Sequence, residues 1–387
     1  MINITNKTNC CGCHACYNIC PQFCIRMEQD LEGFKYPIVD KSKCIECNLC
    51  EKVCPIINNI NEPSINMPPL AFAAFNKNEK IRSESSSGGL LSIIAEHVLA
   101  QGGLIYGAAF DENFNVVHQC ASNSESLGKL RGSKYVESVI GDTYKHIKEN
   151  LENSTLVLFS GTPCQVHGLK TYLIKDYDNL ICTDLICHGV PSPLIWNKYL
   201  NYREKTNDSK TRYVNFRAKI TGWKNFSFYM KFENDSEYTA TFHKDIFMRG
   251  FLTDLYLRPS CYECKFKIKN RISDFTLADF WGIEQLAYEI DDDKGISLVM
   301  IHSLKAKKLL EKFKDKIVTK QMDFFQSINC NSMMVQSANF NKNRNSFFKG
   351  LHKTKQNIAL YIEHSLIKSR SKRFKFYIKN LYINLFK

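Results

Sequence analysis

Ten of the 17 cysteines in this 387-residue chain lie before residue 55, and their spacing constrains the fold more than any other feature. They form two blocks of one pattern: three cysteines separated from each other by two residues, then a fourth cysteine three residues on, directly before a proline. Block one is Cys10, Cys13, Cys16 and Cys20 with Pro21, and block two is Cys44, Cys47, Cys50 and Cys54 with Pro55.

This spacing is typical of bacterial two-cluster ferredoxins, in which the fourth cysteine of each block ligates the cluster of the other block. We therefore predict a module over residues 1–56 that holds two [4Fe–4S] clusters. Cluster one is assigned to Cys10, Cys13, Cys16 and Cys54, and cluster two to Cys44, Cys47, Cys50 and Cys20. The alternative is a pair of zinc sites, but zinc motifs usually pair two short Cys-x2-Cys units across a loop. Cys11 and Cys24 fall outside the spacing and are interpreted as ordinary thiols.

The rest of the sequence favours an intracellular, water-soluble protein. The segment Met1–Lys7 has no apolar stretch behind a basic start, so we expect no secretory signal. In a reducing cytoplasm, clustered cysteines bind metals or carry out redox chemistry more often than they form disulfides. No run reaches the roughly 18 apolar residues that a membrane-spanning helix needs.

The net charge of +13 is concentrated at the C-terminus, because the segment 342–387 holds 12 Lys and Arg and one acid, Glu363. Apolar residues in this tail recur at helical spacing, at Phe374, Tyr377, Ile378, Leu381, Tyr382 and Leu385. We predict a basic amphipathic helical tail that could contact the anionic inner face of the plasma membrane. The alternative is a helix that packs on the body or on a partner. No nucleic-acid-binding module accompanies the charge, so no nucleic-acid partner is expected.

Between the module and the tail, the sequence predicts a mixed α/β body, so the whole chain is of the α+β or α/β class. Residues 57–70 are rich in Asn and Pro and are interpreted as a linker. The first part of the body, 71–150, shows a strand, a helix and a hairpin, at 71–75, 90–99, and 104–110 with 116–121.

In the second part of the body, 151–335, strands alternate with helices, which indicates a partly parallel sheet with helices on its faces. Strands are predicted at 155–159 and 179–186, helices at 165–175 and 303–314, and an antiparallel section at 211–243. Cys182, Cys120 and Cys330 are interpreted as core thiols.

Seven short motifs of the body, taken in order, resemble the coenzyme F-420 hydrogenase/dehydrogenase beta-subunit family. They are Ser86–Gly89, Gly107–Phe110, Arg131–Val136, Ser160–Gln165, Cys187–Ser192, Cys261-x2-Cys264 and Asp279–Gly282. With the cysteine blocks, the resemblance runs to about residue 330. It implies an iron–sulfur flavoprotein that binds FAD and acts on a deazaflavin or another organic substrate. Relatives with a fused ferredoxin module are similar to proteins found among exopolysaccharide biosynthesis enzymes, and plant chlorophyll-pathway reductases of the family act without a deazaflavin.

The residues themselves are compatible with a flavin site. Ser86, Ser87, Gly88 and Gly89 precede the predicted helix 90–99, where free backbone N–H groups and close-approach glycines form an anion site. An ordinary serine N-cap is the alternative. Lys134, next to Ser133, could place its charge on a phosphate or near the flavin ring, or could be a surface lysine. No Gly-x-Gly-x-x-Gly follows a strand, so a standard dinucleotide site is not supported.

A third [4Fe–4S] cluster is predicted in the body. Cys164 and Cys187 each follow a predicted parallel strand, and open α/β sheets bind ligands at the carboxyl ends of such strands. Cys261 and Cys264 form a Cys-x2-Cys pair beside Lys265 and Lys267, and the resemblance implies a cluster in this region. The alternatives are zinc or nothing at the pair, and buried thiols at the strand ends.

His188, next to Cys187, is the candidate proton donor to the substrate, with Lys134 as a second catalytic candidate. A purely structural histidine is the alternative, and Asp279 either orients a cofactor group or caps a turn. We expect an iron–sulfur flavin-dependent oxidoreductase that works with a redox partner, such as a ferredoxin or a reductase, on a small-molecule or lipid-linked substrate. The alternative function is a ferredoxin-like electron carrier without chemistry of its own that serves a partner enzyme.

Overall fold

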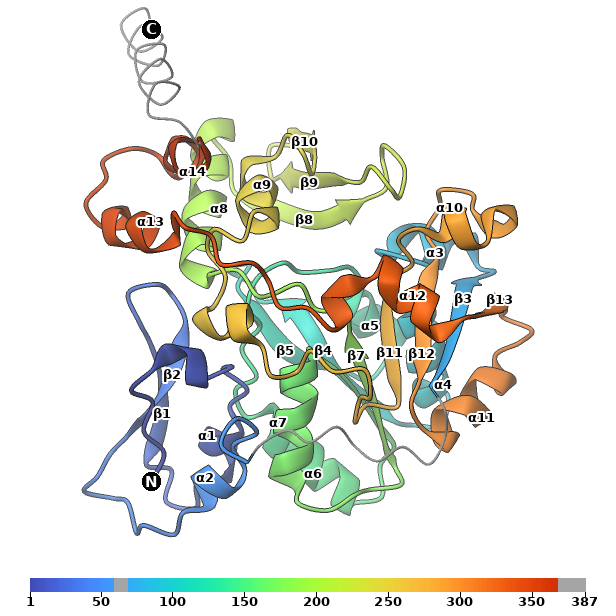
Figure 1. Ribbon diagram of the computed structural model, residues 1–387, viewed down its shortest axis with the longest axis horizontal. Coiled ribbons are helices and arrows are strands. Elements are labelled where there is room, and N and C mark those ends of the chain that lie inside the picture. Colours follow the sequence, from blue (N-terminus) through green and yellow to red (C-terminus); the bar gives the residue numbers. More distant parts are fainter. Residues whose placement is uncertain (59–68, 368–387) are drawn as a thin grey trace, which may run out of the picture.

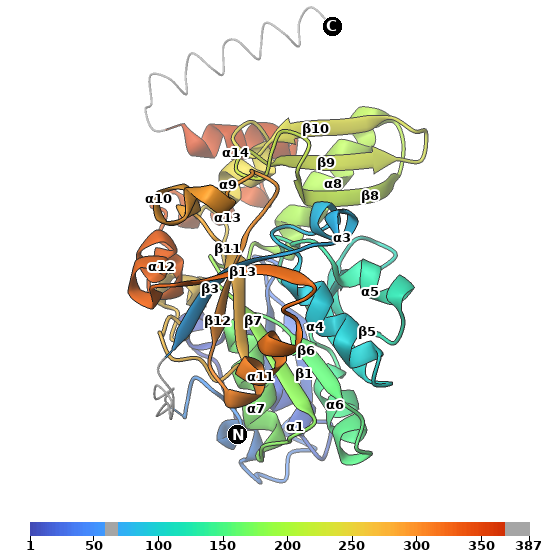
Figure 2. The same ribbon diagram turned by 90° about the vertical axis from the view of Figure 1, so that its right-hand side faces the viewer.

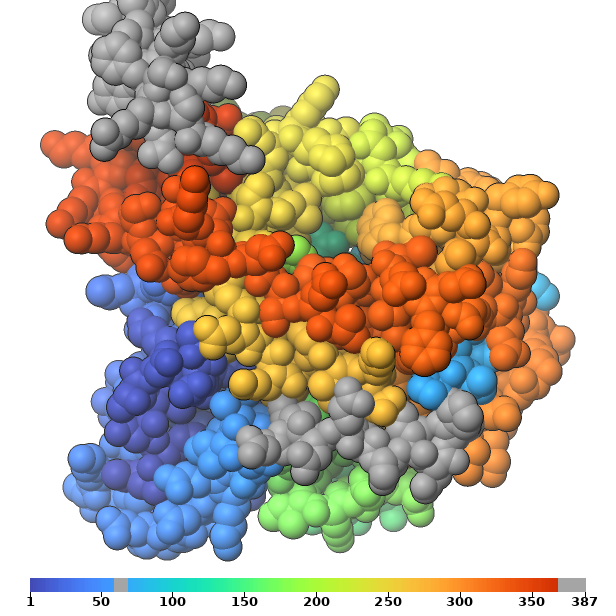
Figure 3. Space-filling model, viewed as in Figure 1, coloured from blue at the N-terminus to red at the C-terminus, as the bar shows by residue number. Residues whose placement is uncertain are grey.

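The computed structural model describes residues 1–58 and 69–367, which form an N-terminal module, a body around one large sheet, and a cap. Figure 1 shows the module (blue) beside the lower part of the body and the cap (light green to yellow, with red helices) above it. Figure 3 shows the module as a lobe in contact with the yellow segment that follows the cap. The mixed α/β fold that the sequence predicts is confirmed.

The module consists of two similar halves, each with a cysteine block. Its elements are η1 (Lys7–Asn9), α1 (Ala15–Ile19), β1 (Ile25–Gln29), β2 (Lys35–Val39) and α2 (Leu49–Lys52), and β1 pairs antiparallel with β2. His14 and Asn48 occupy the same place in the two blocks, between the second and third cysteine, and both have left-handed backbones, with φ of 63° and 57°. In each half this left-handed residue is the N-cap of the short helix that carries the third cysteine.

The body is built on an eight-stranded mixed sheet, of order β13-β3-β12-β11-β7-β6-β4-β5. The pairs β4–β6, β6–β7 and β7–β11 are parallel, and the other four are antiparallel. The bounds are β3 (Leu70–Asn76), β4 (Leu104–Phe110), β5 (Val116–Ala121), β6 (Val157–Ser160), β7 (Leu180–Leu185), β11 (Phe275–Asp279), β12 (Ser297–Ile301) and β13 (Ile317–Met322).

Helices cover both faces of this sheet, as Figure 2 shows. Along β6 the side chains alternate: Leu158 packs in one buried cluster, whereas Val157 and Phe159 pack in another. The first face is covered by α4 (Leu90–Leu99), α5 (Ser124–Leu130) and α11 (Leu304–Lys312), and the second by α6 (Thr143–Glu152), α7 (Pro163–Leu173) and α12 (Phe324–Cys330). Smaller elements are α3 (Glu79–Glu84), η2 (Pro259–Glu263), α10 (Ile283–Leu286), η3 (Tyr288–Ile290) and η4 (Ser332–Met334).

The predicted elements are found close to the predicted residues. The helix expected at 90–99 is α4, and the expected hairpin is β4 with β5. Helix α7 begins two residues earlier than expected, because Thr162 and Gln165 form a capping box and Pro163 occupies the first turn.

The cap is a separate aromatic core above the sheet. It contains α8 (Pro193–Asn207), β8 (Thr211–Ala218), β9 (Ser227–Phe232), β10 (Glu237–Thr241), α9 (Ile246–Leu252), α13 (Arg344–Leu351) and α14 (Ile358–Leu366). The three strands form the predicted antiparallel section, and Trp196, Phe216 and Phe247 are fully buried among them. Phe34 and Tyr36 of the module join the same core, so the cap also fixes the module.

Within the described ranges, no helix combines the length and apolar character needed to cross a bilayer. The first part of the predicted tail forms α13 and α14, whose residues Phe347 and Ile362 are buried against the cap. The predicted amphipathic face from Phe374 to Leu385 lies outside the described residues.

Candidate iron–sulfur centres and cofactor site

The four cysteines predicted for cluster one line a single hollow of about 340 Å³, here called the first hollow. Cys10, Cys13 and Cys16 come from block one, and Cys54 comes from block two, directly after α2. The remaining wall is mainly apolar, with Ile2, Ile4, Met27, Pro37 and Ile56. Four thiols from two blocks on an apolar wall fit a [4Fe–4S] cluster with crossed ligation.

The second hollow, of about 360 Å³, brings together the four cysteines predicted for cluster two, Cys20, Cys44, Cys47 and Cys50. Cys47 is exposed, so this hollow opens at the surface of the module. Cys24 also lines it, with its Sγ 3.3 Å from the Sγ of Cys20. No sequence pattern pointed to this fifth thiol, because it stands outside the repeated spacing.

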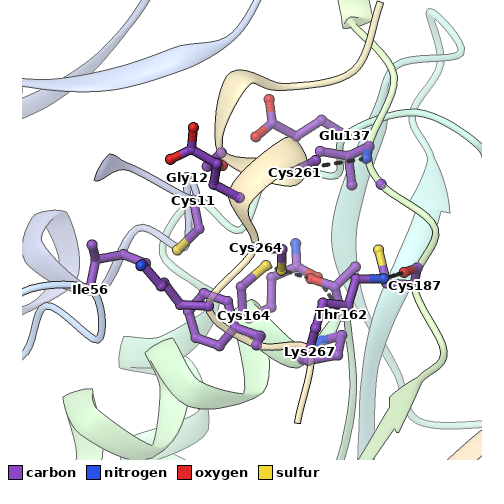
Figure 4. Close-up of a pocket in the computed structure, with 18 of the residues that line it drawn as sticks. Cys11, Gly12, Ile56, Glu137, Thr162, Cys164, Cys187, Cys261, Cys264 and Lys267 are labelled. Atoms are coloured by element: carbon purple, nitrogen blue, oxygen red, sulfur yellow. Dashed lines mark hydrogen bonds between the residues drawn. The ribbon is translucent and has the colours of Figure 1, made fainter. Parts of the chain in front are cut away.

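The third hollow, at about 700 Å³, is larger than the other two and lies in the body (Figure 4). Cys164, Cys187, Cys261 and Cys264 all line it, as predicted, and Cys11 of the module joins them. Cys164 lies in the first turn of α7 after β6, Cys187 follows β7, and the other two belong to the η2 segment. Three loops that are distant in the sequence therefore converge on one space.

Polar groups around the third hollow hold the thiols in place. The Oγ1 of Thr162 lies 3.1 Å from the Sγ of Cys164, and the N–H of Val190 donates to the Sγ of Cys261 over 3.5 Å. Lys267 donates from Nζ to the carbonyl of Cys187 and to that of Met333, so the loop after β7 is tied to the segment around η4.

Burial raises the pKa of the Cys187 thiol to about 12, and burial together with Cys187 and Cys264 raises the pKa of Cys261 well above its ordinary value. Four thiolates packed this closely need a compensating cation, which a metal cluster supplies. In the part of the chain that the structure describes, no three Cys, His, Asp or Glu side chains converge on the position of one metal ion. The donor set of the third hollow, four thiols around a larger space, fits a cluster.

The first and third hollows share a wall, which is made of Cys11, Gly12 and Ile56. The Cys13 thiol of the first hollow, together with burial, raises the pKa of the Cys11 thiol well above its ordinary value, against an opposing effect of the Cys164 thiol in the third hollow. None of the described residues lines both the second and the third hollow. The space inside the body is therefore next to cluster one rather than cluster two.

His188 lies at the edge of the third hollow and is paired with a carboxylate. Its Nε2 is 2.6 Å from the Oδ1 of Asp254, and its ring meets Phe251 edge-on. The other oxygen of Asp254 accepts the N–H of Asn339 over 3.1 Å, so the carboxylate is itself held in place. The sequence predicted the histidine but not its partner.

The predicted cofactor loop lies at the start of α4. Gly89 is the N-cap, with a left-handed φ of 81°, and as a glycine it has no side chain to cap the helix. The N–H of Ser133 donates to the Oγ of Ser86 over 2.7 Å, which brings the two predicted parts of the site together. The Oγ of Ser87 donates to the carbonyl of Ile296, and the N–H of Gly88 donates to the Oγ of Ser297.

Two lysines adjoin this loop. Lys134 donates from Nζ to the carbonyls of Lys129 and Arg131, both at 2.9 Å, and burial lowers its pKa to about 7. Lys219 of the cap donates to the carbonyl of Ser87 over 2.7 Å, and burial, with a contribution from Arg82, lowers its pKa to about 8. An anion bound here would restore their charge, so an uncapped helix and two partly buried lysines fit a phosphate group. Sequence reasoning did not identify Lys219, because a lysine directly after a strand of alternating polar and apolar residues looks like an ordinary surface lysine.

Asp279, at the end of β11, has a structural role in the described chain. Its Oδ1 accepts from Nη2 of Arg217 over 2.9 Å and from Nε1 of Trp223 over 2.7 Å. Trp223 stacks on Trp281 with ring centres 5.3 Å apart. Asp279 therefore ties the cap to the carboxyl edge of the sheet. The sequence suggested a cofactor contact or a turn cap for this residue, but not this role.

Two segments of the chain match known protein families. Residues 154–324 match the family model for the C terminus of the coenzyme F420 hydrogenase/dehydrogenase beta subunit, and residues 9–57 match the 4Fe-4S dicluster domain. The structure is similar to a chain of the F420-reducing [NiFe] hydrogenase complex from Methanosarcina barkeri, with 15% sequence identity, a TM-score of 0.46, and coverage of 77% of this chain and 98% of that chain. No match was found among curated proteins.

The chain thus joins a segment that matches a 4Fe-4S dicluster domain to a segment that matches the C terminus of the coenzyme F420 hydrogenase/dehydrogenase beta subunit. It is an electron-transfer protein of the oxidoreductase type, related to the coenzyme F420 hydrogenase beta subunit, and the resemblance seen in the sequence is confirmed.

Proposed function

We propose that this chain is an iron–sulfur flavoprotein oxidoreductase with three [4Fe–4S] clusters and one FAD. The observation that carries the proposal is the third hollow, where four cysteines from three loops meet next to the wall of the first hollow. A protein that only carried electrons would need the two clusters of the module and no further set of cysteines in its body. The third set therefore favours an enzyme over the alternative of a carrier protein.

The residues of the third hollow fit the proposed cluster. Cys164, Cys187, Cys261 and Cys264 would hold it, with Thr162 and the Val190 N–H bonded to two of the sulfurs. Such clusters exchange one electron at a time, at potentials set by hydrogen bonds to sulfur and by burial. Lys267 keeps the loop that carries Cys187 in position through its bond to the Cys187 carbonyl.

The proposed FAD site is the start of α4. Backbone N–H groups of its first turn, with Ser86, Ser133 and Lys134 beside them, would bind the pyrophosphate. Bound FAD would couple one-electron transfer to two-electron chemistry on an organic substrate. We propose a deazaflavin-like compound or a polysaccharide-pathway metabolite as that substrate, in line with the family resemblance.

His188 would deliver a proton to the reduced substrate. Asp254, 2.6 Å from its Nε2, fixes the orientation of the ring. We further propose a cytoplasmic protein that exchanges electrons with a ferredoxin or a reductase through the module. Contact of the tail with a membrane, and a lipid-linked substrate, are part of the same proposal.

The test is anaerobic purification with quantitation of iron, sulfide and flavin. Three clusters correspond to about twelve iron atoms per chain and two clusters to about eight. About twelve irons with one FAD are expected. About eight irons and no flavin, even after reconstitution with iron, sulfide and FAD, would reject the enzyme in favour of the carrier protein.

A further inference from the structure

Arg258 is fully buried at the junction of the module and the body, just before η2. Its guanidinium reaches into the module, where Nε donates to the carbonyl of Cys10 over 2.8 Å and Nη2 to the carbonyl of Lys35 over 2.9 Å. The group also lies against the ring of Tyr36, 4.4 Å from its centre. A buried guanidinium always carries its charge, so this is a permanent cation inside the junction.

The cation touches a predicted ligand of cluster one. Nη2 of Arg258 lies 3.5 Å from the Sγ of Cys10, within hydrogen-bond reach of a sulfur. Through its backbone the same residue reaches the third hollow, because its carbonyl accepts the N–H of Cys261 over 2.9 Å. One residue therefore joins a cysteine of the first hollow to a cysteine of the third.

Glu137 of the body balances part of this charge. Its Oε1 lies 2.5 Å from Nη1 of Arg258, on the side chain's other branch, and it too is buried. The space between the two is closed: a Cβ on Gly12 would lie 2.6 Å from the Glu137 oxygen and 2.8 Å from Nη1 of Arg258. The ion pair is thus held with its positive end toward Cys10.

We propose that Arg258 is a positioning residue that raises the reduction potential of cluster one above that of cluster two. Reduction adds a negative charge to a cluster, so an adjacent cation and an N–H···S bond both favour the reduced form. The effect falls with distance, and Arg258 contacts Cys10 but no residue of the second hollow among its bonds in the described chain. Electrons in the module would then collect at cluster one, beside the third hollow, a consequence that rests on the proposed function.

The experiment is a potentiometric titration of the full chain, in which electron paramagnetic resonance distinguishes the two module clusters. In Arg258→Gln, we expect the ratio of reduced cluster one to reduced cluster two to fall about tenfold. This corresponds to a shift of about 59 mV in the difference between the two reduction potentials. Glu137→Gln leaves the cation uncompensated and is expected to shift the distribution in the opposite direction. Arg258→Lys keeps the charge but loses the fork of donors, so it should fall between the wild type and Arg258→Gln.

Arg344→Gln is the matched control. Arg344 is also buried, binds Glu32 of the module with Nη1 at 3.0 Å, and bonds to the carbonyl of Leu257, and none of its hydrogen bonds in the described chain reaches a predicted cluster ligand. It should leave the distribution unchanged. An equal shift in this variant, or shifts of the same sign in Arg258→Gln and Glu137→Gln, would overturn the proposal.

Two features keep the test decisive. If Arg258→Gln does not fold, Glu137→Gln and Arg258→Lys still give opposite predictions for the sign of the shift. The titration reads only the two module clusters, and it can be repeated in the Cys261→Ser/Cys264→Ser variant. Failure of the third cluster or of FAD binding is therefore recorded by the iron and flavin content and not by the potentials.

Discussion

The module and the body gather cysteines around their hollows in different ways. In the module, three of the four predicted ligands at each hollow lie within one short block, and only the fourth comes from the other block. In the body, the four predicted ligands come from loops after β6, after β7 and around η2, which the sheet brings together. A site of the first kind is encoded by local spacing, whereas a site of the second kind depends on the whole topology.

The strongest test of this difference removes the third site alone. In Cys261→Ser/Cys264→Ser, we expect iron to fall by about a third, from about twelve to about eight atoms per chain, while the module keeps its clusters. Iron analysis and visible spectra measure the result. Cys120→Ser is the control and should keep all the iron, because Cys120, which the sequence interpretation had put in the core, is an exposed thiol of β5. Unchanged iron in the double variant would show that the body holds no cluster.

Crossed ligation in the module makes a second prediction. Cys54→Ser should destroy the cluster of the first hollow, since Cys54 lines that hollow although it belongs to block two. The paramagnetic signal that survives in Cys54→Ser should therefore match that of Cys10→Ser and differ from that of Cys50→Ser. A match with Cys50→Ser would mean that each block ligates its own cluster.

The contact between module and body can be broken at Gly12. Gly12→Ala is expected to lower the melting temperature and to expose the module to limited proteolysis, because the new Cβ would lie 2.6 Å from Glu137 and φ is 70°. Gly102→Ala is the matched control, with φ of 72° and, apart from its chain neighbours, no atom of the described residues within 4 Å of the added Cβ. It carries only the backbone cost of about 1 kcal/mol, whereas overpacking adds about 1–3 kcal/mol in Gly12→Ala. Equal effects in the two variants would contradict close packing at the junction.

The smallest expected effect concerns the core of the body. His118 bonds to the Oγ of Ser138 at 2.8 Å, and burial lowers its pKa to about 4. The unfolded chain binds a proton at this histidine below about pH 6.5 and the folded chain does not, so stability falls as pH decreases from about 6.5 toward 4.

This histidine should cost the wild type about 2 kcal/mol between pH 7 and pH 5, and His118→Asn should lose that part of the pH dependence. Melting temperatures across this range measure it. Parallel curves for the two proteins would mean that His118 does not titrate as its burial implies.

The comparison also explains what could be predicted from the sequence. Local patterns placed helix α4 and the hairpin of β4 and β5 on the observed residues, because amphipathic spacing and turn residues act over short distances. The candidate cysteines of all three hollows were selected in the same way, from spacing and from strand ends. The structure then brings each predicted set around one space.

The residues that sequence reasoning missed act between distant segments. Arg258 showed no signal, because its partners Cys10 and Glu137 are more than a hundred residues away. Cys11 lies on the wall between the first and third hollows, and Lys219 donates to the carbonyl of Ser87. Such roles arise from the docking of one unit on another, which local periodicity does not encode.

The matching left-handed residues His14 and Asn48 mark the module as a duplicated unit, with Cys10 corresponding to Cys44 and Cys20 to Cys54. Because each hollow takes its last cysteine from the opposite copy, neither copy contains a complete set of ligands. A single ancestral copy could complete its centres only by exchanging cysteines with a second chain, as in a domain-swapped dimer. Fusion of the two copies would have turned that association between chains into a property of one polypeptide.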